Sequence, residues 1–132
     1  MPVGAPDWSL AVGIRAYLWP QFVEGSKLLT AEDIEVSAGS QGTVITYAVP
    51  SNKDLYIIAL VVSARPPPAS FQLWLYDEDL ALTLFRSVTQ NNYSFSFSSP
   101  IVVERGHTVT LYVYNNESAT KWFSAYIWCY EV

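Results

Sequence analysis

The sequence predicts an all-β protein, a two-layer antiparallel sandwich of the jelly-roll kind. From Asp33 onwards, short runs of β-branched and aromatic residues alternate with Gly, Pro, Asn and Asp, as in sandwiches and barrels. Apolar residues make up 51% of the chain and aromatic residues 15%, enough to fill a core between two sheets. The length of 132 residues suits a single domain, 1–132. We expect residues 33–132 to form the sandwich core and residues 1–30 an N-terminal arm or short extra element.

Nine strands are expected, a number that suits a jelly roll or a related Greek-key sandwich. In chain order they are 34–38, 43–49, 55–65, 70–76, 80–88, 93–98, 101–104, 107–114 and 121–130. Residues typical of turns separate them: 39–42, 50–54, the prolines 66–68, the acidic triplet 77–79, 90–92, Gly106 and 115–118. The longest apolar stretch, 55–64, is about half as long as a transmembrane helix and therefore predicts a buried strand.

Residues 8–19 fit two different elements. Alternation typical of a strand is shown by Leu10, Val12, Ile14, Ala16 and Leu18, while one helical face would carry Leu10, Ile14, Tyr17 and Leu18. Gly13 weakens the helical interpretation, and Pro20 ends either element. We favour a strand or an extended arm, which could pack on a neighbouring subunit.

The charge of the chain argues against several partners. The net charge is −5, and the seven Lys and Arg residues are spread along the sequence without a cluster. Binding of nucleic acid or of an anionic membrane requires clustered basic residues, so neither is expected. The first seven residues lack the pattern of a secretion signal, and no membrane insertion is expected.

Few residues could carry chemistry. His107 is the single histidine and follows Gly106, with no nucleophile motif around any serine, so we expect a histidine in a surface turn. The triplet Asp77-Glu78-Asp79 is interpreted as a solvated hairpin turn rather than a calcium loop. Cys129 is the single cysteine and is expected to be a buried, inert thiol. We therefore expect no enzyme, and no catalytic, cofactor-binding or metal-binding residues.

The aromatic strands are the most informative feature. In the last strand, alternation places Trp122, Tyr126, Trp128 and Tyr130 on one face and Phe123, Ile127 and Cys129 on the other. Tyr112 and Tyr114 lie opposite Val109, Leu111 and Val113, and a third row comprises Tyr93, Phe95 and Phe97. A strand of a two-layer sandwich normally has one solvated face, so these rows require an explanation.

Two functions from different classes explain such rows. The first is an interface between identical subunits, because aromatic residues are enriched in interface cores. The second is a carbohydrate-binding module, in which the rings stack on sugars. A third explanation is that the N-terminal segment covers the rows. The candidate interface or ligand-binding residues are Tyr112, Tyr114, Trp122, Tyr126, Trp128 and Tyr130.

Two segments resemble small β-sandwich structural proteins of viruses and phages. The first is Tyr47-Ala48-Val49-Pro50-Ser51-Asn52-Lys53 before a long apolar strand. The second is Pro100-Ile101-Val102-Val103-Glu104-Arg105-Gly106 before a Tyr/Val strand that ends at Asn115. The resemblance implies a virion component, such as a capsid, decoration or fibre subunit, that forms homo-oligomers or binds other virion proteins. It implies a location in the virion or the host cytoplasm.

Overall fold

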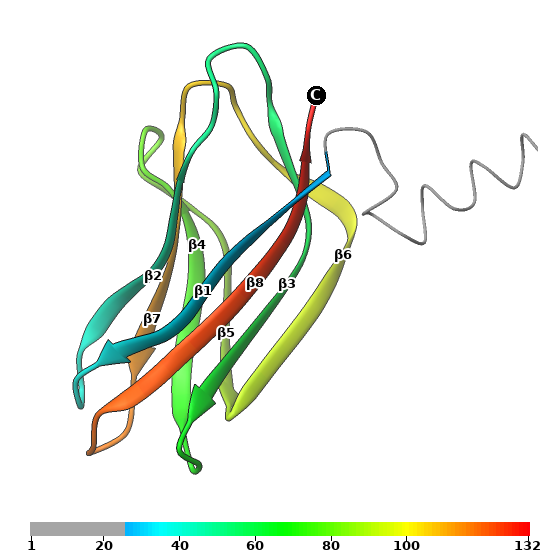
Figure 1. Ribbon diagram of the computed structural model, residues 1–132. Coiled ribbons are helices and arrows are strands. Elements are labelled where there is room, and N and C mark those ends of the chain that lie inside the picture. Colours follow the sequence, from blue (N-terminus) through cyan, green and yellow to red (C-terminus); the bar gives the residue numbers. More distant parts are fainter. Residues whose placement is uncertain (1–25) are drawn as a thin grey trace, which may run out of the picture.

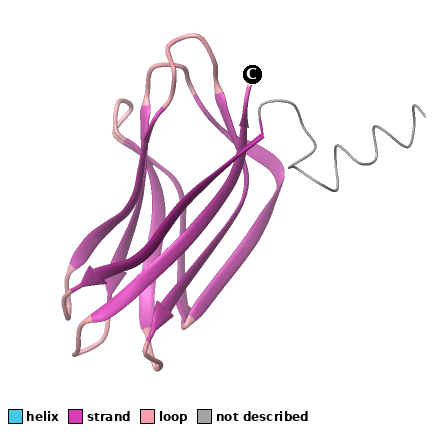
Figure 2. Cartoon of the chain, viewed as in Figure 1, coloured by secondary structure: helices cyan, strands magenta, loops and turns pink. Residues whose placement is uncertain are grey.

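The computed structural model describes residues 26–132, which form eight strands and no helix (Figures 1 and 2). The strands are β1 (Ser26–Val36), β2 (Gln41–Ala48), β3 (Leu55–Arg65), β4 (Ser70–Asp77), β5 (Leu82–Gln90), β6 (Asn92–Val103), β7 (Thr108–Asn115) and β8 (Lys121–Glu131). Within this part of the chain, therefore, no helix is long and apolar enough to cross a membrane. The interpretations of residues 8–19 lie outside the described residues.

The strands form two antiparallel four-stranded layers. One layer has the order β1-β8-β3-β6 and the other has the order β5-β4-β7-β2. β5 and β6 connect the layers and pair with each other only at Gln90 and Asn92. Two interleaved sheets of four strands with this order are the topology of a jelly roll. The predicted fold class is confirmed.

One predicted boundary between strands is wrong. Residues 93–98 and 101–104 were expected to be separate strands, but residues 92–103 form one strand, β6. The pairing of β6 with β3 shifts between the pairs Ile57–Ile101 and Ala59–Ser96, which leaves residues 97–100 of β6 bulged. A bulge is a position where a strand tolerates a proline, so Pro100 does not end β6.

The first strand starts earlier than the alternation suggested. The sequence predicted a strand only from residue 34, whereas β1 begins at Ser26. Its pairing with β8 shifts between Ala31 and Ile34, and Asp33 has a φ of 56°. The backbone N–H of Asp33 donates to Ser124 Oγ at 3.2 Å. This bulge breaks the period of two, so alternation does not run continuously through β1.

The inward rows of the two layers form the core. Leu60 and Val62 of β3 and Leu73 and Leu75 of β4 are completely buried. Phe71 of β4 meets Phe123 of β8 edge to face, with ring centroids 5.1 Å apart. Because these rows point inward, the alternate residues of the same strands point outward.

A polar group closes one end of the sandwich beside this core. Lys27 Nζ on β1 donates to the hydroxyl of Tyr47 on β2 at 2.9 Å and lies 3.5 Å from Glu131 Oε2 on β8. The Tyr47 hydroxyl in turn donates to Glu131. Strands from both layers are thus connected by side chains at this end.

β1 and β2 approach each other closely at Gly42. A Cβ added to Gly42 would lie 2.5 Å from Cγ2 of Val36, whose side chain is buried. We expect Gly42→Ala to lower the free energy of unfolding by about 1–3 kcal/mol, as measured by urea denaturation. Val36→Ala in the same chain removes the clash, so adding Gly42→Ala to that background should cost less. Equal costs in both backgrounds would contradict this packing.

Candidate interaction surfaces

Each layer of the sandwich has an outer face with aromatic side chains. We call the outer surface of the β1-β8-β3-β6 layer the β8 face and that of the β5-β4-β7-β2 layer the β7 face. On β8, Phe123, Ala125, Ile127 and Cys129 are buried in the core, while Trp122, Tyr126, Trp128 and Tyr130 are half-buried and point outward. The division of this strand into two faces is as the alternation predicted, and the row of Trp and Tyr is the outer one.

Uncharged side chains form the centre of the β8 face. Three rungs that each cross β1, β8, β3 and β6 carry Ser26, Tyr130, Tyr56 and Val102; Leu28, Trp128, Ala59 and Ser96; and Thr30, Tyr126, Val61 and Ser94. Leu28 is 47% exposed and Val102 is 46% exposed. The rings of Tyr56 and Tyr130 stack with centroids 5.1 Å apart. Burial raises the pKa of Tyr130 above its usual value, so its hydroxyl stays neutral.

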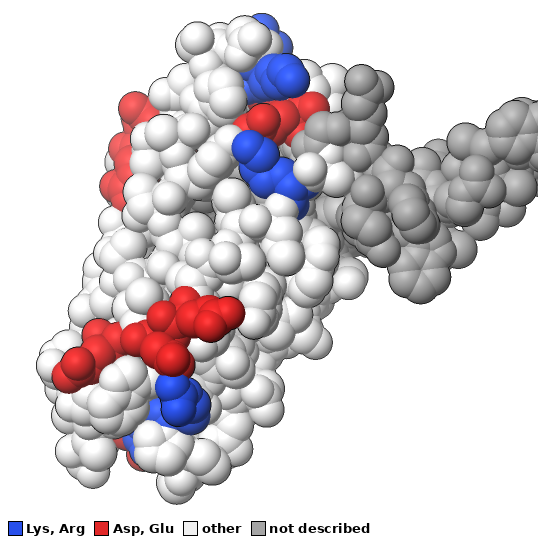
Figure 3. Space-filling model, in the orientation of Figure 1, with Lys and Arg blue, Asp and Glu red and all other residues white. Residues whose placement is uncertain are grey.

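Charged side chains lie toward the ends of this face. Glu35 and Arg65 flank Trp122 on one rung, and Arg65 forms an ion pair with Asp33. Figure 3, in which β1 and β8 lie nearest the viewer, shows charged groups toward both ends and uncharged surface between them. The middle of the β8 face is thus an uncharged, largely aromatic patch with a charged rim, a pattern typical of protein interfaces.

The β7 face is aromatic but more polar. Trp74 on β4 stacks against Tyr112 on β7, with ring centroids 5.6 Å apart. The Arg86 guanidinium on β5 lies over the Trp74 ring, 4.7 Å from its centroid. The Tyr112 hydroxyl donates to Glu78 Oε2 at 2.5 Å, and this bond raises the pKa of Tyr112. The rings of Trp74 and Tyr112 therefore already contact polar groups of the same face.

The six candidate residues identified from the sequence do not share one surface. Trp122, Tyr126, Trp128 and Tyr130 lie on the β8 face, whereas Tyr112 and Tyr114 lie on the opposite, β7 face. Sequence reasoning missed Leu28, Tyr56 and Val102 on the β8 face, because only strand pairing brings them beside β8. It also missed Trp74 and Tyr76 on the β7 face. Their alternation with Leu73 and Leu75 was a usable signal for these two residues.

Trp122 lies apart from the central rungs, in a recess of about 480 Å³. Arg65, Pro66 and Pro67 line the recess together with Trp122. Lys121 Nζ donates to the carbonyl of Pro66 at 2.8 Å and holds the proline segment against the start of β8.

The third aromatic row points inward rather than outward. Tyr93, Phe95 and Phe97 of β6 gather around Phe85 of β5, with centroid distances of 6.2, 5.4 and 5.0 Å respectively. We call these four residues the flank cluster, because they lie where the two layers meet only through Gln90 and Asn92. Phe95 nevertheless remains 43% exposed.

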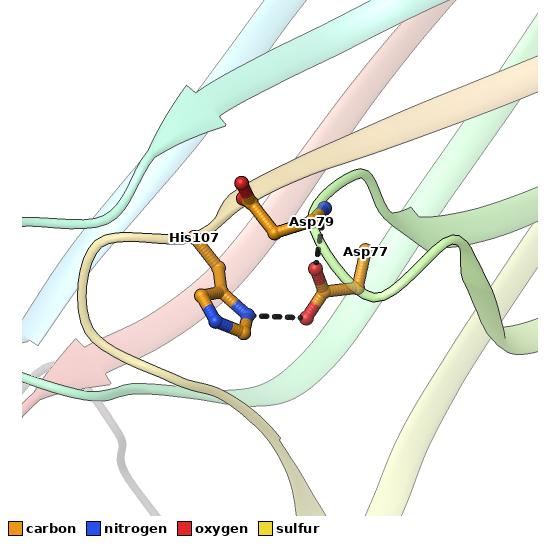
Figure 4. A group of neighbouring side chains, drawn as sticks. All are labelled: Asp77, Asp79 and His107. Atoms are coloured by element: carbon orange, nitrogen blue, oxygen red, sulfur yellow. Dashed lines mark hydrogen bonds and ion pairs between the residues drawn. The ribbon is translucent and has the colours of Figure 1, made fainter.

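His107 and Asp77 are less solvated than the sequence suggested. Asp77 continues the inward row of β4 and is 1% exposed, and the side chain of His107 is 20% exposed. His107 Nδ1 lies 3.0 Å from Asp77 Oδ2 (Figure 4). The interpretation of the whole acidic triplet as a solvated turn is wrong for Asp77, because Phe71, Leu73 and Leu75 set the side that residue 77 must take.

Asp79 completes this group, whose ligand atoms lie within 4.8 Å of one another. Asp77 Oδ1 accepts the N–H groups of Asp79 and Leu80, and Asp79 Oδ2 accepts the N–H of Thr108 at 2.7 Å. Three of the four carboxylate oxygens are therefore engaged by the protein, if the His107 contact is included. The group acts as a clamp between the β4–β5 and β6–β7 turns.

The contact between His107 and Asp77 in the clamp changes the pKa of both residues. Burial alone would raise the pKa of Asp77, but the hydrogen bonds from His107, Leu80 and Asp79 outweigh it and lower the pKa. The hydrogen bond to Asp77 raises the pKa of His107, and burial opposes this rise. The pair is thus stabilised as carboxylate and imidazolium.

Fold and surfaces together define a small jelly roll with two aromatic outer faces. No protein-family model matches the sequence, and no curated protein matches it. Solved structures share the fold. A chain of infectious bursal disease virus, Gx strain, is 14% identical with a TM-score of 0.50, over 83% of this chain and 32% of the viral chain. This likeness shows the fold alone.

Two further structures are similar at lower TM-scores. The VP2 subviral particle of infectious bursal disease virus gives 12% identity and a TM-score of 0.47, over 83% of this chain and 33% of that one. The insecticidal delta-endotoxin Cry8Ea1 of Bacillus thuringiensis gives 12% identity and 0.45, over 74% and 19%. The present chain spans about a third of the length of the viral chains that it matches.

Stability should depend on pH through the clamp. The raised pKa of His107 contributes stability that is fully present below about pH 6.5, its unfolded value, and is lost as the pH rises through the folded-state value. The lowered pKa of Asp77 contributes stability that is present above about pH 3.8 and is lost as the pH falls through the folded-state value. Urea midpoints of the wild type should therefore fall between pH 6 and pH 8.5. His107→Gln should show no such fall, and an identical pH profile for both proteins would refute the clamp.

Cys129 should be inert in the folded protein. Burial raises the pKa of its thiol to about 12, and the side chain is 1% exposed. We expect no reaction with an aromatic disulfide reagent at pH 8 in the native state and complete reaction in urea. Rapid labelling of native protein would show that β8 is turned the other way.

Proposed function

We propose that this chain is a non-enzymatic structural protein, a small virion component that self-associates through its β8 face. The uncharged aromatic centre of that face carries the proposal. A solvated sheet face normally presents polar side chains outward, whereas eight of the twelve side chains on three neighbouring rungs here are Tyr, Trp, Leu, Val or Ala and none is charged. Exposed patches of this kind mark protein–protein contacts.

The size of the β8 face supports the same proposal. Four strands about 4.8 Å apart and about ten residues long, at roughly 3.3 Å per residue, give a face on the order of 600 Å² in projection. A standard interface buries roughly 800 Å² per partner. Most of a stable contact between two copies therefore fits on this one face.

The state of the single histidine and the single cysteine suits a structural role. His107 is engaged by Asp77 within the clamp, and the Cys129 thiol is buried with a pKa of about 12. The virion role itself is supported by the resemblance of the sequence to viral and phage sandwich proteins. It agrees with a fold that chains of infectious bursal disease virus share.

Carbohydrate binding at the β7 face is the second candidate. Trp74, Tyr76 and Tyr112 lie there among Gln72, Arg86 and Glu78, a mixture of rings and hydrogen-bonding groups that suits sugars. However, Arg86 and Tyr112 come from strands on either side of β4 and cover both faces of the Trp74 ring. Stacking on a sugar would have to displace one of them, so this function ranks below assembly.

Trp128→Ala tests the first candidate. The substitution removes the ring at the centre of the β8 face, so association of copies should weaken by about 2 kcal/mol or more, as for aromatic anchors in interfaces. Sedimentation across a concentration series measures this change, and a melting curve checks that the variant is folded. Because its core-facing neighbours are untouched, the melting temperature of the monomer should stay close to that of the wild type.

Trp74→Ala is the matched control, since it removes the same side chain from the opposite face. It should leave the sedimentation profile unchanged. Loss of association in the Trp74 variant alone, or a wild type that is monomeric at all concentrations, would overturn assembly through the β8 face. Retention of the wild type on a polysaccharide column that disappears with Trp74→Ala would instead establish the second candidate.

A further inference from the structure

β6 has one edge without a strand partner among residues 26–132. Its other edge pairs with β3, but toward β5 it pairs only through Asn92 with Gln90. Beyond that pair β5 and β6 diverge from the turn that they share (Figure 1). A free strand edge exposes backbone N–H and C=O groups, and it readily accepts a further strand.

Apolar side chains line this edge on its inner side. The flank cluster of Phe85, Tyr93, Phe95 and Phe97 fills the space between the layers there. Its outer side is uncovered, because Phe95 is 43% exposed. An occupant of this edge must therefore offer apolar side chains inward and backbone groups sideways.

Residues 10–18 of the same chain have that pattern. Leu10, Val12, Ile14, Ala16 and Leu18 form one apolar row at a period of two, and the alternate positions carry Ala11, Gly13, Arg15 and Tyr17. The first row suits the flank cluster, and the second, with its arginine and tyrosine, suits solvent.

The connection is long enough to reach β6. Leu28 lies on the same rung as Ser96 of β6, so a strand added beyond β6 at that rung is four strand spacings across and two residues along from Ser26, which is about 20 Å. The eight residue steps from Leu18 to Ser26 can span up to roughly 26 Å when extended.

We propose that residues 10–18 add to the free edge of β6 as a further strand of the same molecule, with Leu10, Val12, Ile14, Ala16 and Leu18 facing the flank cluster. The added strand covers Phe95 and satisfies the free backbone groups of residues 92–97. This proposal does not depend on the proposed function, because it uses neither the β8 face nor the β7 face.

Amide hydrogen exchange of the full chain tests the proposal directly. With the strand in place, both the amides of residues 93–97 that face β3 and those that face away from it are protected. Without it, only those that face β3 are protected, and that alternating pattern in the wild type overturns the proposal. Protection that is the same at all protein concentrations is expected for a strand from the same molecule. Protection that disappears on dilution assigns the strand to another copy and equally overturns it.

Two adjacent substitutions supply a matched pair. Val12→Asp places a carboxylate against the flank cluster and should speed exchange of the outward-facing amides of β6 by roughly tenfold or more. Ala11→Asp adds the same charge on the solvent side and should change nothing. Equal effects of the two substitutions, or none from either, contradict the assigned register.

Discussion

The inward rows of the two sheets pack against each other, and Phe71 and Phe123 make contact across the layers near the starts of β4 and β8. Both rings are completely buried, and they come from different layers. Side chains alternate strictly along a strand. Because Phe71 and Phe123 point inward, the directions of all the remaining side chains on β4 and β8 are determined. Trp74 and Trp128 are on the outside for this reason. The two candidate faces are thus consequences of the core.

Alternation predicted what lies along one strand and failed to predict what lies across strands. The orientation of Trp128 and the burial of Cys129 followed from a period of two on a single strand. The separation of Tyr112 from Trp128 did not follow, because it depends on which sheet each strand joins. Leu28 and Val102 reach the β8 face from strands remote in sequence, and no local pattern contains that pairing. The predicted strand boundaries were wrong at the bulges near Asp33 and Pro100, where the pairing register shifts and the period of two is interrupted.

The aromatic rings of the two outer faces have different neighbours. On the β7 face, Arg86 and Glu78 belong to the same molecule as the rings that they contact, so the face is complete before any partner arrives. On the β8 face, the rings mainly contact one another. Trp128 has a tilted neighbour in Tyr126, with centroids 6.3 Å apart, and a β-sheet surface beneath. Burial by a second surface adds more to the β8 face than to the β7 face, because less polar hydration has to be removed.

The bulge in β1 also limits how copies of the protein can meet. β1 is the outermost strand of its sheet, and its pairing pattern is interrupted at Asp33, beside Glu32 and Glu35. A strand that is kinked and acidic in this region is a poor template for another chain. Edge-to-edge pairing of sheets from neighbouring molecules through β1, which would form a continuous sheet, is therefore unfavourable. Association through the outer faces of the sheets is then favoured over association through β1. Such an assembly is complete once those faces are covered.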